Sequence, residues 1–447
     1  MNASGPSRHR PATRPRASRL EDSRRRVPPR RGRRDPCGRR TIRQDPTDPD
    51  FVQDPFPFYA RARALGPVVR WEEYGMPVAT THAAVTALLR DRRLGRQAPS
   101  PGPVPPHLAP FYRIEADSML ELEPPRHTRL RGLVLRAFTS RRVAALAPGI
   151  EATCHRLLDA ALGRPTAEED AAPSASPGSR GETGAPPFDL LSAYCRPVPV
   201  LTIARLLGVP EADAPRLLAW STAMVAMYQA GRTRADEDGA SEAAAAFAAY
   251  IGERIDEVRA APRECLLADL VTARGEDDAL TDGEMAATAI LLLNAGHEAT
   301  VHALGGAVAA LLAAGARPAD PARAVEEQFR HDPPLHVFTR WAYEDVEVGG
   351  VTIRAGEQVG CLLASAGRDP AAHAVPDRFD PAREPRGHAA FGGGIHFCVG
   401  APLARLEMQI ALRALWERCP DLQLAAPPLY APIYHFRGLG RLPVRRG

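Results

Sequence analysis

The residues with the clearest chemical potential lie in segment 391–400, FGGGIHFCVG, which carries a single cysteine, Cys398. The residues that follow, 401–407, predict a helix, because Pro402 falls in a first turn, where its missing N–H costs little. A helix N-terminus carries about half a positive charge, which stabilises a thiolate. The glycines allow tight turns and let a flat group approach the backbone. We therefore expect Cys398 to be held open as a thiolate ligand, as at one axial position of haem iron.

The pattern Phe-Gly-x-Gly-x-His-x-Cys-x-Gly in this segment resembles the haem-binding loop of the cytochrome P450 family. The matching positions, in chain order, are Phe391, Gly392, Gly394, His396, Cys398, Gly400 and, just beyond the loop, Ala401. The segment could also be a glycine-rich surface loop with an inert cysteine, or a zinc site. Zinc normally takes four ligands, and His396 and Cys398 have no neighbours in the sequence to complete such a set. The resemblance implies that Cys398 ligates the iron of haem b and that Phe391 and His396 contact this cofactor.

A second chemical segment lies within a long apolar stretch. Residues 283–314 predict one helix, about 50 Å long at 1.5 Å per residue. Thr281 and Glu284 form a capping-box pattern at its start. The stretch is too apolar for a surface helix, whereas polar residues at 294, 297 and 298 interrupt its middle and argue against a membrane span. We therefore expect the helix to cross the core of the protein.

The middle of this helix has the sequence AGHEAT over residues 295–300. The small pair Ala295 and Gly296 lets a flat cofactor or O₂ approach the backbone. A buried acid such as Glu298 needs either a function or a structural partner. The segment resembles the oxygen-activating segment of the P450 family, and the resemblance implies that Glu298 delivers protons.

The sequence departs from the family pattern at the next position, where Ala299 replaces the usual alcohol and Thr300 comes one residue later. One residue turns a side chain by about 100° around a helix. Three possibilities stay open: a substrate hydroxyl or an ordered water completes the proton relay, Thr300 does so after a local helix distortion, or oxygen activation is poorly coupled. Glu298 and Thr300 are the predicted catalytic residues.

The two propionate carboxylates of haem require Arg or His donors. His127 and Arg131 lie four residues apart in a predicted helix and therefore share a face. With the residues that follow, their segment resembles the C-helix of the family. Arg340, which comes after a Pro-Pro pair, and His396 lie at similar family positions. The resemblance thus implies a propionate site formed by His127, Arg131, Arg340 and His396.

A third motif, Glu327-x-x-Arg330, places two opposite charges on one helix face, where they can pair. Its place in the chain relative to Cys398 resembles that of the Glu-x-x-Arg motif of the family, and Arg378 resembles the third member of this ion-paired core. The resemblance implies a structural role, in which buried charges position the segment on the haem side.

Residues 1–45 form an arm rich in Arg and Pro, which we expect to be disordered because it has no apolar periodicity. Its first 44 residues hold fifteen Arg and three acidic residues, although the whole chain has a formal charge of only +4. Three roles compete for the arm: binding to nucleic acid or an anionic surface, a targeting segment, and upstream sequence included by a mis-set start, which we favour. The low-complexity segment 164–187 is expected to be a solvated insertion in the domain 46–447.

Together the motifs predict the mostly α fold of the P450 family, with a small β region and the haem between the 283–314 helix and the 398–416 helix. The implied enzyme is a monooxygenase that inserts one oxygen atom of O₂ into a small organic substrate, by hydroxylation or epoxidation, in secondary metabolism. Two alternatives stay open, and both are compatible with Ala299. One is a degenerate haem protein that acts as a binding module, and the other is a peroxide-driven peroxygenase.

Electrons are expected from a ferredoxin and its reductase, because the sequence shows no flavin or iron–sulfur domain. Arg129, Arg131 and Arg405 are candidate docking residues for an acidic carrier. The seven cysteines are scattered and odd in number, which favours a reducing, cytoplasmic compartment. No nucleic-acid partner is expected. Substrate contacts are expected from segments 97–118, 219–232 and 335–338, from Leu292, Leu293 and Ala295, and from the tail near Ile433.

Overall fold

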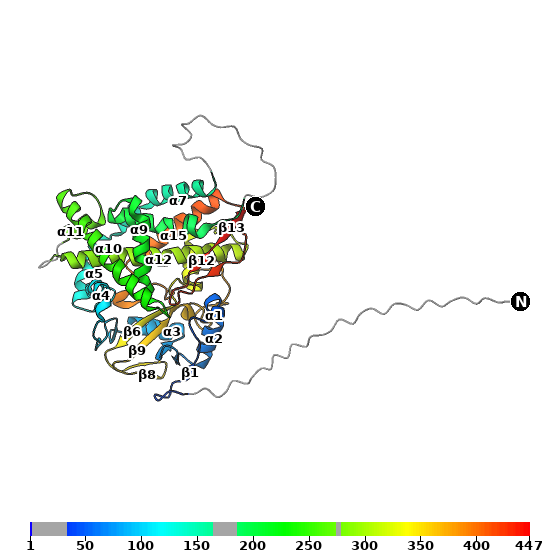
Figure 1. Ribbon diagram of the computed structural model, residues 1–447. Coiled ribbons are helices and arrows are strands. Elements are labelled where there is room, and N and C mark those ends of the chain that lie inside the picture. The colour runs from blue at the N-terminus through cyan, green and yellow to red at the C-terminus, as the bar shows by residue number, and fades with distance from the viewer. Residues whose placement is uncertain (2–33, 164–185, 274–278) are drawn as a thin grey trace.

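The computed structural model describes residue 1 and residues 34–163, 186–273 and 279–447. Its central element is helix α12 (Asp282–Ala313), which confirms the long helix predicted from the sequence. Thr281 and Glu284 form the predicted capping box, in which each side chain accepts the backbone N–H of the other residue. In Figure 1, α12 crosses the helical part of the molecule, and the strands of the main sheet lie below it.

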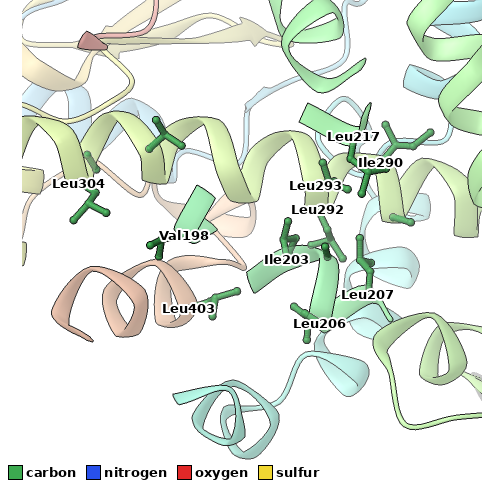
Figure 2. Packing of buried hydrophobic residues seen from close by; sticks show 14 of the residues in the cluster. Val198, Ile203, Leu206, Leu207, Leu217, Ile290, Leu292, Leu293, Leu304 and Leu403 are labelled. Atoms are coloured by element: carbon green, nitrogen blue, oxygen red, sulfur yellow. The ribbon is translucent and has the colours of Figure 1, made fainter. Parts of the chain in front are cut away.

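Among the helices that pack against α12 are α8 (Pro197–Leu207), α9 (Ala214–Val225), α10 (Arg234–Ala260) and α15 (Ala401–Arg418). Figure 2 shows the apolar side chains at this contact, with Leu292 and Leu293 of α12 beside Ile203 of α8. Burial of each such side chain stabilises the fold by about 1.5–3 kcal/mol. These contacts hold α12 in place, and Leu292 and Ile203 also border a cavity beside the middle of this helix.

The main sheet has six strands in the order β1 (Thr41–Ile42), β2 (Val68–Trp71), β3 (Met76–Ala79), β9 (Gln358–Leu362), β6 (Val337–Ala342) and β4 (Leu94–Gly95). Strands β6 and β9 run antiparallel, with Arg340 opposite Val359. Arg96, directly after β4, donates from Nη1 to the carbonyl of Thr339 at 2.9 Å. The sheet thus supports the β6 segment that carries the predicted propionate donor Arg340.

The remaining elements surround this frame. The other helices are α1 (Pro49–Gln53), α2 (Phe56–Leu65), α3 (His82–Arg90), α4 (Ala109–Glu115), α5 (Arg126–Ala137), α6 (Ser140–Ala145), α7 (Ala147–Ala161), α11 (Leu266–Thr272), α13 (Pro321–His331) and α14 (Leu363–Gly367). Short turns of 3₁₀ or π helix are η1 (Pro106–Leu108), η2 (Leu191–Cys195), η3 (Glu211–Asp213), η4 (Ala226–Tyr228) and η5 (Gly394–His396). The other strands are β5 (Phe188–Asp189), β7 (Val346–Val348), β8 (Val351–Ile353), β10 (Leu422–Leu424), β11 (Leu429–Tyr430), β12 (Leu439–Arg441) and β13 (Pro443–Arg446). None of the helices described is long and apolar enough to cross a membrane.

The boundary predicted for the basic arm, residue 45, lies too far along the chain. Strand β1 pairs in parallel with β2, so this segment is part of the main sheet. Arg39 is buried and forms ion pairs of 2.7 Å with Asp35 and with Glu357. An arginine shared by two carboxylates anchors the segment, which composition alone could not indicate. The rest of the predicted arm, residues 2–33, and nearly all of the predicted insertion at 164–187 lie outside the described residues.

The Glu-x-x-Arg pair lies on α13, where Arg330 Nε is 2.7 Å from Glu327 Oε2 and both side chains are buried. The third member of the cluster is Arg383, whose Nε is 3.0 Å from the same Glu327 oxygen. The prediction of Arg378 was wrong, because its side chain is exposed and pairs with Asp380. Arg378 contributes only its backbone carbonyl, which accepts from Arg330 and Arg383. The sequence identified the segment that approaches Glu327, but not which of its arginines turns inward.

Candidate active site

A cavity of about 750 Å³ lies between the middle of α12 and the loop ahead of α15. Its wall includes Ala295, Glu298 and Thr300 of α12. Cys398, which is exposed, belongs to the same wall. The fold therefore brings the two predicted chemical segments to one cavity.

Cys398 lies on a tightly shaped loop. Its N–H donates to the carbonyl of Phe391 at 2.9 Å, which closes the loop. Gly394 has a φ of +65°, and a Cβ there would lie 2.8 Å from the carbonyl oxygen of Leu89, so this position requires glycine. Helix α15 begins at Ala401, the start predicted from residues 401–407, whereas the bound of 398 given to the same helix falls in the loop before it. Cys398 therefore lies just ahead of the first turn, whose N–H groups have no partners within the helix.

Two opposing effects act on the Cys398 thiol. The thiol is accessible on the cavity wall, but the surrounding protein partly removes it from water, and this desolvation raises its pKa. The N–H groups of Gly400 and Ala401 and the charges of Arg131 and Arg405 oppose the shift. The start of α15 thus provides the thiolate with the partners that the motif predicts, and a metal cation at this position would favour the thiolate further.

Three of the predicted propionate donors lie near Cys398 on the cavity wall. On α5, the ring of His127 lies 4.4 Å, between centroids, from the ring of His396. One turn later, Arg131 donates from Nη2 to the carbonyl of Phe397 at 2.6 Å. The ring of His396 is oriented by Glu123, since its Nε2 lies 2.9 Å from Glu123 Oε1. The structure therefore assembles these donors at one end of the cavity.

Two buried polar atoms of the predicted donor set, His127 Nδ1 and Arg340 Nη2, have no hydrogen-bond partner within the part of the chain that the structure describes. Arg340 lies behind the cavity wall, stacked on the ring of Phe338 at 4.7 Å. Burial lowers the pKa of His127 to about 4 and that of Arg340 to about 10. An unsatisfied buried polar group costs about 1–3 kcal/mol. A group with two carboxylates would supply the missing acceptors, so the residues fit haem.

The predicted apolar contacts of the cofactor also border the cavity. Phe391 packs on Phe329, with ring centroids 4.4 Å apart, and Ala295 is exposed on the wall. A Cβ on Gly296 would lie 3.3 Å from Ile203 Cδ1, so the small size of this residue lets α12 pack closely on α8. The access for a flat group that was predicted for the small pair is therefore supplied by Ala295.

Two imidazoles hold the carboxylate of Glu298. His302, one turn later on α12, places its Nε2 3.0 Å from Glu298 Oε1, and His297 places its Nε2 3.2 Å from Oε2. Burial opposes ionisation, but the two imidazoles outweigh it and lower the pKa of Glu298 below its ordinary range. His297 Nδ1 lies 3.0 Å from the carbonyl of Leu293, which can only accept a hydrogen bond. The contact of His297 with Glu298 is therefore attractive when both ring nitrogens carry protons.

The hydroxyl of Thr300 is engaged within its own helix, where it donates to the carbonyl of Gly296 at 2.9 Å. Ala299 presents only a methyl group at the cavity. Helix α12 is continuous through residue 300, so it shows no local distortion that would turn Thr300 into the alcohol position. The structure instead gives the acid a histidine partner, His302.

The rest of the wall is mostly apolar and comes largely from the predicted substrate segments. Its residues from these segments include Ile114, Ser118, Val225, Met227, Leu292, Leu335, Val337 and Phe338. The prediction of Leu293 was wrong, because this residue packs into the core between helices (Figure 2). The tail contributes His435 and Phe436, close to the predicted position near Ile433.

Sequence reasoning missed Glu123 and His302, and it included Glu115 only within the predicted substrate segment 97–118. The spacing of His302, four residues after Glu298, is the helical spacing at which side chains meet, so this contact could have been predicted. The positions of the Glu123 and Glu115 side chains depend on loops and on a short helix in a proline-rich region, where the sequence has no regular pattern that would predict which side chains face the cavity.

A single open cysteine, with donors for two carboxylates close by, meets the requirements of a haem bound through thiolate. Comparison with known proteins leads to the same class. The family model for cytochrome P450 matches residues 322–420. The chain is 39% identical over 416 residues to the cytochrome P450 monooxygenase PikC of Streptomyces venezuelae, covering 89% of this chain and 92% of that protein.

Two further relatives extend the comparison. The chain is 38% identical over 364 residues to mycinamicin IV hydroxylase/epoxidase of Micromonospora griseorubida, covering 78% of this chain and 83% of that protein. The crystal structure of P450BioI, in complex with acyl carrier protein ligated to hexadec-9Z-enoic acid, has 33% sequence identity and a TM-score of 0.80, covering 89% of this chain and 99% of that one. The chain belongs to the cytochrome P450 family. It is a monooxygenase, and its cofactor is haem b.

Proposed function

We propose that this P450 oxidises an apolar or partly polar small molecule of secondary metabolism by hydroxylation or epoxidation. The observation that carries the proposal is that Cys398 and Glu298 share one cavity of about 750 Å³ with a mostly apolar wall. Haem iron with a thiolate ligand supplies the activation of dioxygen when it is bound. Phe391, Ala295 and Gly296 border the space for this cofactor. The hydroxylase/epoxidase relative supports the reaction type.

The chain offers a complete set of groups for holding the cofactor. Cys398 would ligate the iron, and His127, Arg131, Arg340 and His396 would bind the two carboxylates. The proposal is supported by His127 Nδ1 and Arg340 Nη2, which are buried and have no partner among the described residues. A carboxylate beside either atom would accept a hydrogen bond from it and so remove the free-energy cost of burying that atom without a partner.

Glu298 is the proposed proton carrier of the cavity. His302 Nε2 donates a hydrogen bond to Glu298 Oε1 and can resupply this oxygen with a proton, whereas Oε2 only lies 3.2 Å from His297 Nε2, which has no hydrogen-bond partner among the described residues. Because Ala299 has no hydroxyl, the last transfer into the cavity requires a water or a hydroxyl of the substrate. Thr300 takes part only through its oxygen, since its proton is donated to its own helix.

The proposed electron donors are a ferredoxin and its reductase, and the proposed location is the cytoplasm. Of the three predicted docking residues, Arg131 belongs to the cavity wall and is better placed for the cofactor. Arg129 and Arg405 are each about one-third exposed and form ion pairs with Glu284 and Glu326. They can contribute positive potential to a docking face without being free charges.

The absorption spectrum of the purified holoprotein, reduced and then exposed to carbon monoxide, tests the central claim. A strongly red-shifted Soret band supports ligation by cysteinate, and an unshifted band with haem loaded contradicts it. Turnover of small molecules with a surrogate ferredoxin and reductase then tests the reaction. Because Ala299 occupies the alcohol position, two alternatives are tested alongside. Substrate binding without turnover favours a binding module, and turnover with peroxide alone favours a peroxygenase.

A further inference from the structure

The part of the cavity wall built by α4, η4 and the neighbouring loops contains two arginines, and each has an acidic partner. Arg96 forms an ion pair with Glu121 and stacks on the ring of Phe338 at 4.4 Å. Arg232 lies 3.2 Å from Glu237, with which it also forms a hydrogen bond. The positive charges of this region are therefore neutralised by the protein itself.

One acid of the same region has no such compensation. Glu115 ends α4 and lines the cavity, and its Oε2 accepts a hydrogen bond of 2.7 Å from the hydroxyl of Tyr228 on η4. Among the residues that the structure describes, Glu115 forms no ion pair, and Arg96, the positive charge that acts on it, is engaged by Glu121. Burial, and then the negative charge of Glu121, raise the pKa of Glu115 to about 7. Ionisation of this carboxyl group on the wall of an apolar cavity therefore costs free energy. A ligand that brings a positive charge to the group would offset this cost.

We propose that Glu115 anchors a basic amine of the substrate, so that the substrate class is an apolar molecule with one protonated amino group. The amine would lie against the carboxylate that Tyr228 orients, and the apolar body would fill the rest of the cavity. This inference rests on the proposed function, because it takes the cavity as the substrate site.

A protonated amine matches the site better than a neutral or an anionic head group. It supplies both the positive charge and the N–H donor that Glu115 lacks, and charge-assisted hydrogen bonds are roughly twice as strong as neutral ones. An anion would place a second negative charge beside Glu115 and Glu121. The other unpaired acid of the wall, Glu407 on α15, is 2% exposed, and burial raises its pKa far above the ordinary range, so it carries no charge to offer.

The binding equilibrium of three ligands with the same alkyl chain tests the proposal. N,N-dimethyldodecylamine, dodecanol and dodecanoate are titrated calorimetrically into the holoenzyme at pH 8 and at pH 6. We expect the amine to bind at least about tenfold more tightly than the alcohol at pH 8, as for a desolvated charge pair. The preference should weaken at pH 6, where Glu115 is protonated more often. The other charged groups of this wall are the Arg96–Glu121 pair and the Arg232–Glu237 pair, and Tyr228 donates its hydrogen bond to Glu115.

The variant Glu115→Gln keeps the shape of the side chain and should bring the affinities for amine and alcohol to within about twofold of each other. Glu347→Gln, which removes an exposed acid on β7, is the matched control and should leave the preference intact. The proposal is overturned if the wild-type protein binds amine and alcohol equally, if Glu115→Gln retains the preference, or if dodecanoate binds best. Failure to bind any of the three ligands also contradicts the proposed class. None of these measurements depends on turnover. The binding results can therefore contradict the amine proposal while the carbon monoxide spectrum supports the haem-thiolate assignment. The spectrum can likewise contradict that assignment while the binding results support the amine proposal.

Discussion

The two sides of the cavity treat their functional groups differently. On the cysteine side, His127 and Arg340 each leave a buried atom without a partner among the described residues. On the α12 side, the carboxylate of Glu298 lies within 3.2 Å of two imidazole nitrogens, although His297 Nε2 and His302 Nδ1 are themselves buried without a hydrogen-bond partner among the described residues. The first side is built for a ligand that brings its own acceptors. The second side gives its acid partners from the protein, which suits a group that must move protons instead of binding a cofactor.

The largest expected effect comes from removal of the ligand on the cysteine side. Cys398→Ser should abolish the red-shifted carbon monoxide band and lower monooxygenase turnover by about 1000-fold or more, because a neutral hydroxyl does not replace a thiolate on the iron. Haem content is measured in the same samples, so that lost haem is distinguished from a changed ligand. Cys37→Ser, at an exposed cysteine, should leave band and turnover unchanged. Retention of the band in Cys398→Ser would show that another group ligates the iron.

The second prediction concerns the cluster that supports the cysteine side. Glu327→Gln leaves Arg330 and Arg383 without their shared carboxylate, so we expect a loss of about 3–5 kcal/mol in the free energy of unfolding. Arg378→Ala should change it by less than about 0.5 kcal/mol, because this side chain is exposed. Denaturant unfolding of the holoprotein measures both. Similar losses in the two variants would restore Arg378 as the third member of the cluster.

The parts of the site that the sequence predicted are those determined by local spacing. The Cys398 loop, the capping box of α12 and the pairing of His127 with Arg131 on one helix face each follow from residues a few positions apart. The orientations of the Arg383 and Glu115 side chains could not be predicted in this way, because they depend on which segments meet in three dimensions. Helix α4 begins at Ala109 with a proline in its first turn, at the end of a proline-rich stretch without a regular sequence pattern, and it carries Glu115 to the cavity wall.

The α12 side is tested by a third set of variants. Glu298→Gln should lower turnover by about 100-fold, which is the lower end for loss of a general acid. His302→Phe should lower it by about tenfold, because Glu298 Oε1 then loses its donor. Product formed per NADH consumed and the solvent isotope effect are the measurements, since a defect in proton delivery changes both and a defect in folding changes neither.

Thr300→Val is the matched control for this set. Its hydroxyl is already donated to the carbonyl of Gly296, so we expect turnover and coupling to change by less than about threefold. If Thr300→Val is as damaging as Glu298→Gln, the hydroxyl reaches the relay in spite of this bond. The order Glu298, His302, Thr300 would instead support the histidine as the partner of the acid.

The smallest expected effect distinguishes His127, which lines the cavity and could bind a haem carboxylate, from His373, which does not line the cavity. Burial lowers the pKa of both His127 and His373 to about 4, from 6.5. In each case the unfolded state binds the proton more readily, so the stability that the neutral ring contributes is present above pH 6.5 and is lost as the pH falls towards 4. His373→Phe should flatten this decline by up to about 1.4 kcal/mol per pH unit in apoprotein and holoprotein alike, because both of its ring nitrogens lack partners among the described residues.

His127→Phe should flatten the decline in the apoprotein in the same way, but in the holoprotein it should speed the loss of haem. A carboxylate of bound haem would accept a hydrogen bond from His127 Nδ1, for which the described residues provide no acceptor. His373 does not line the cavity, so a bound haem should not change its surroundings. Unfolding curves between pH 4 and 7 and the rate of haem transfer to an acceptor apoprotein measure the two effects. If haem loss is equally fast in both variants, the unpartnered nitrogen of His127 is a consequence of packing and not part of the haem site. Arg340 would then be the one residue left to support the view that the cysteine side is built for a ligand with its own acceptors.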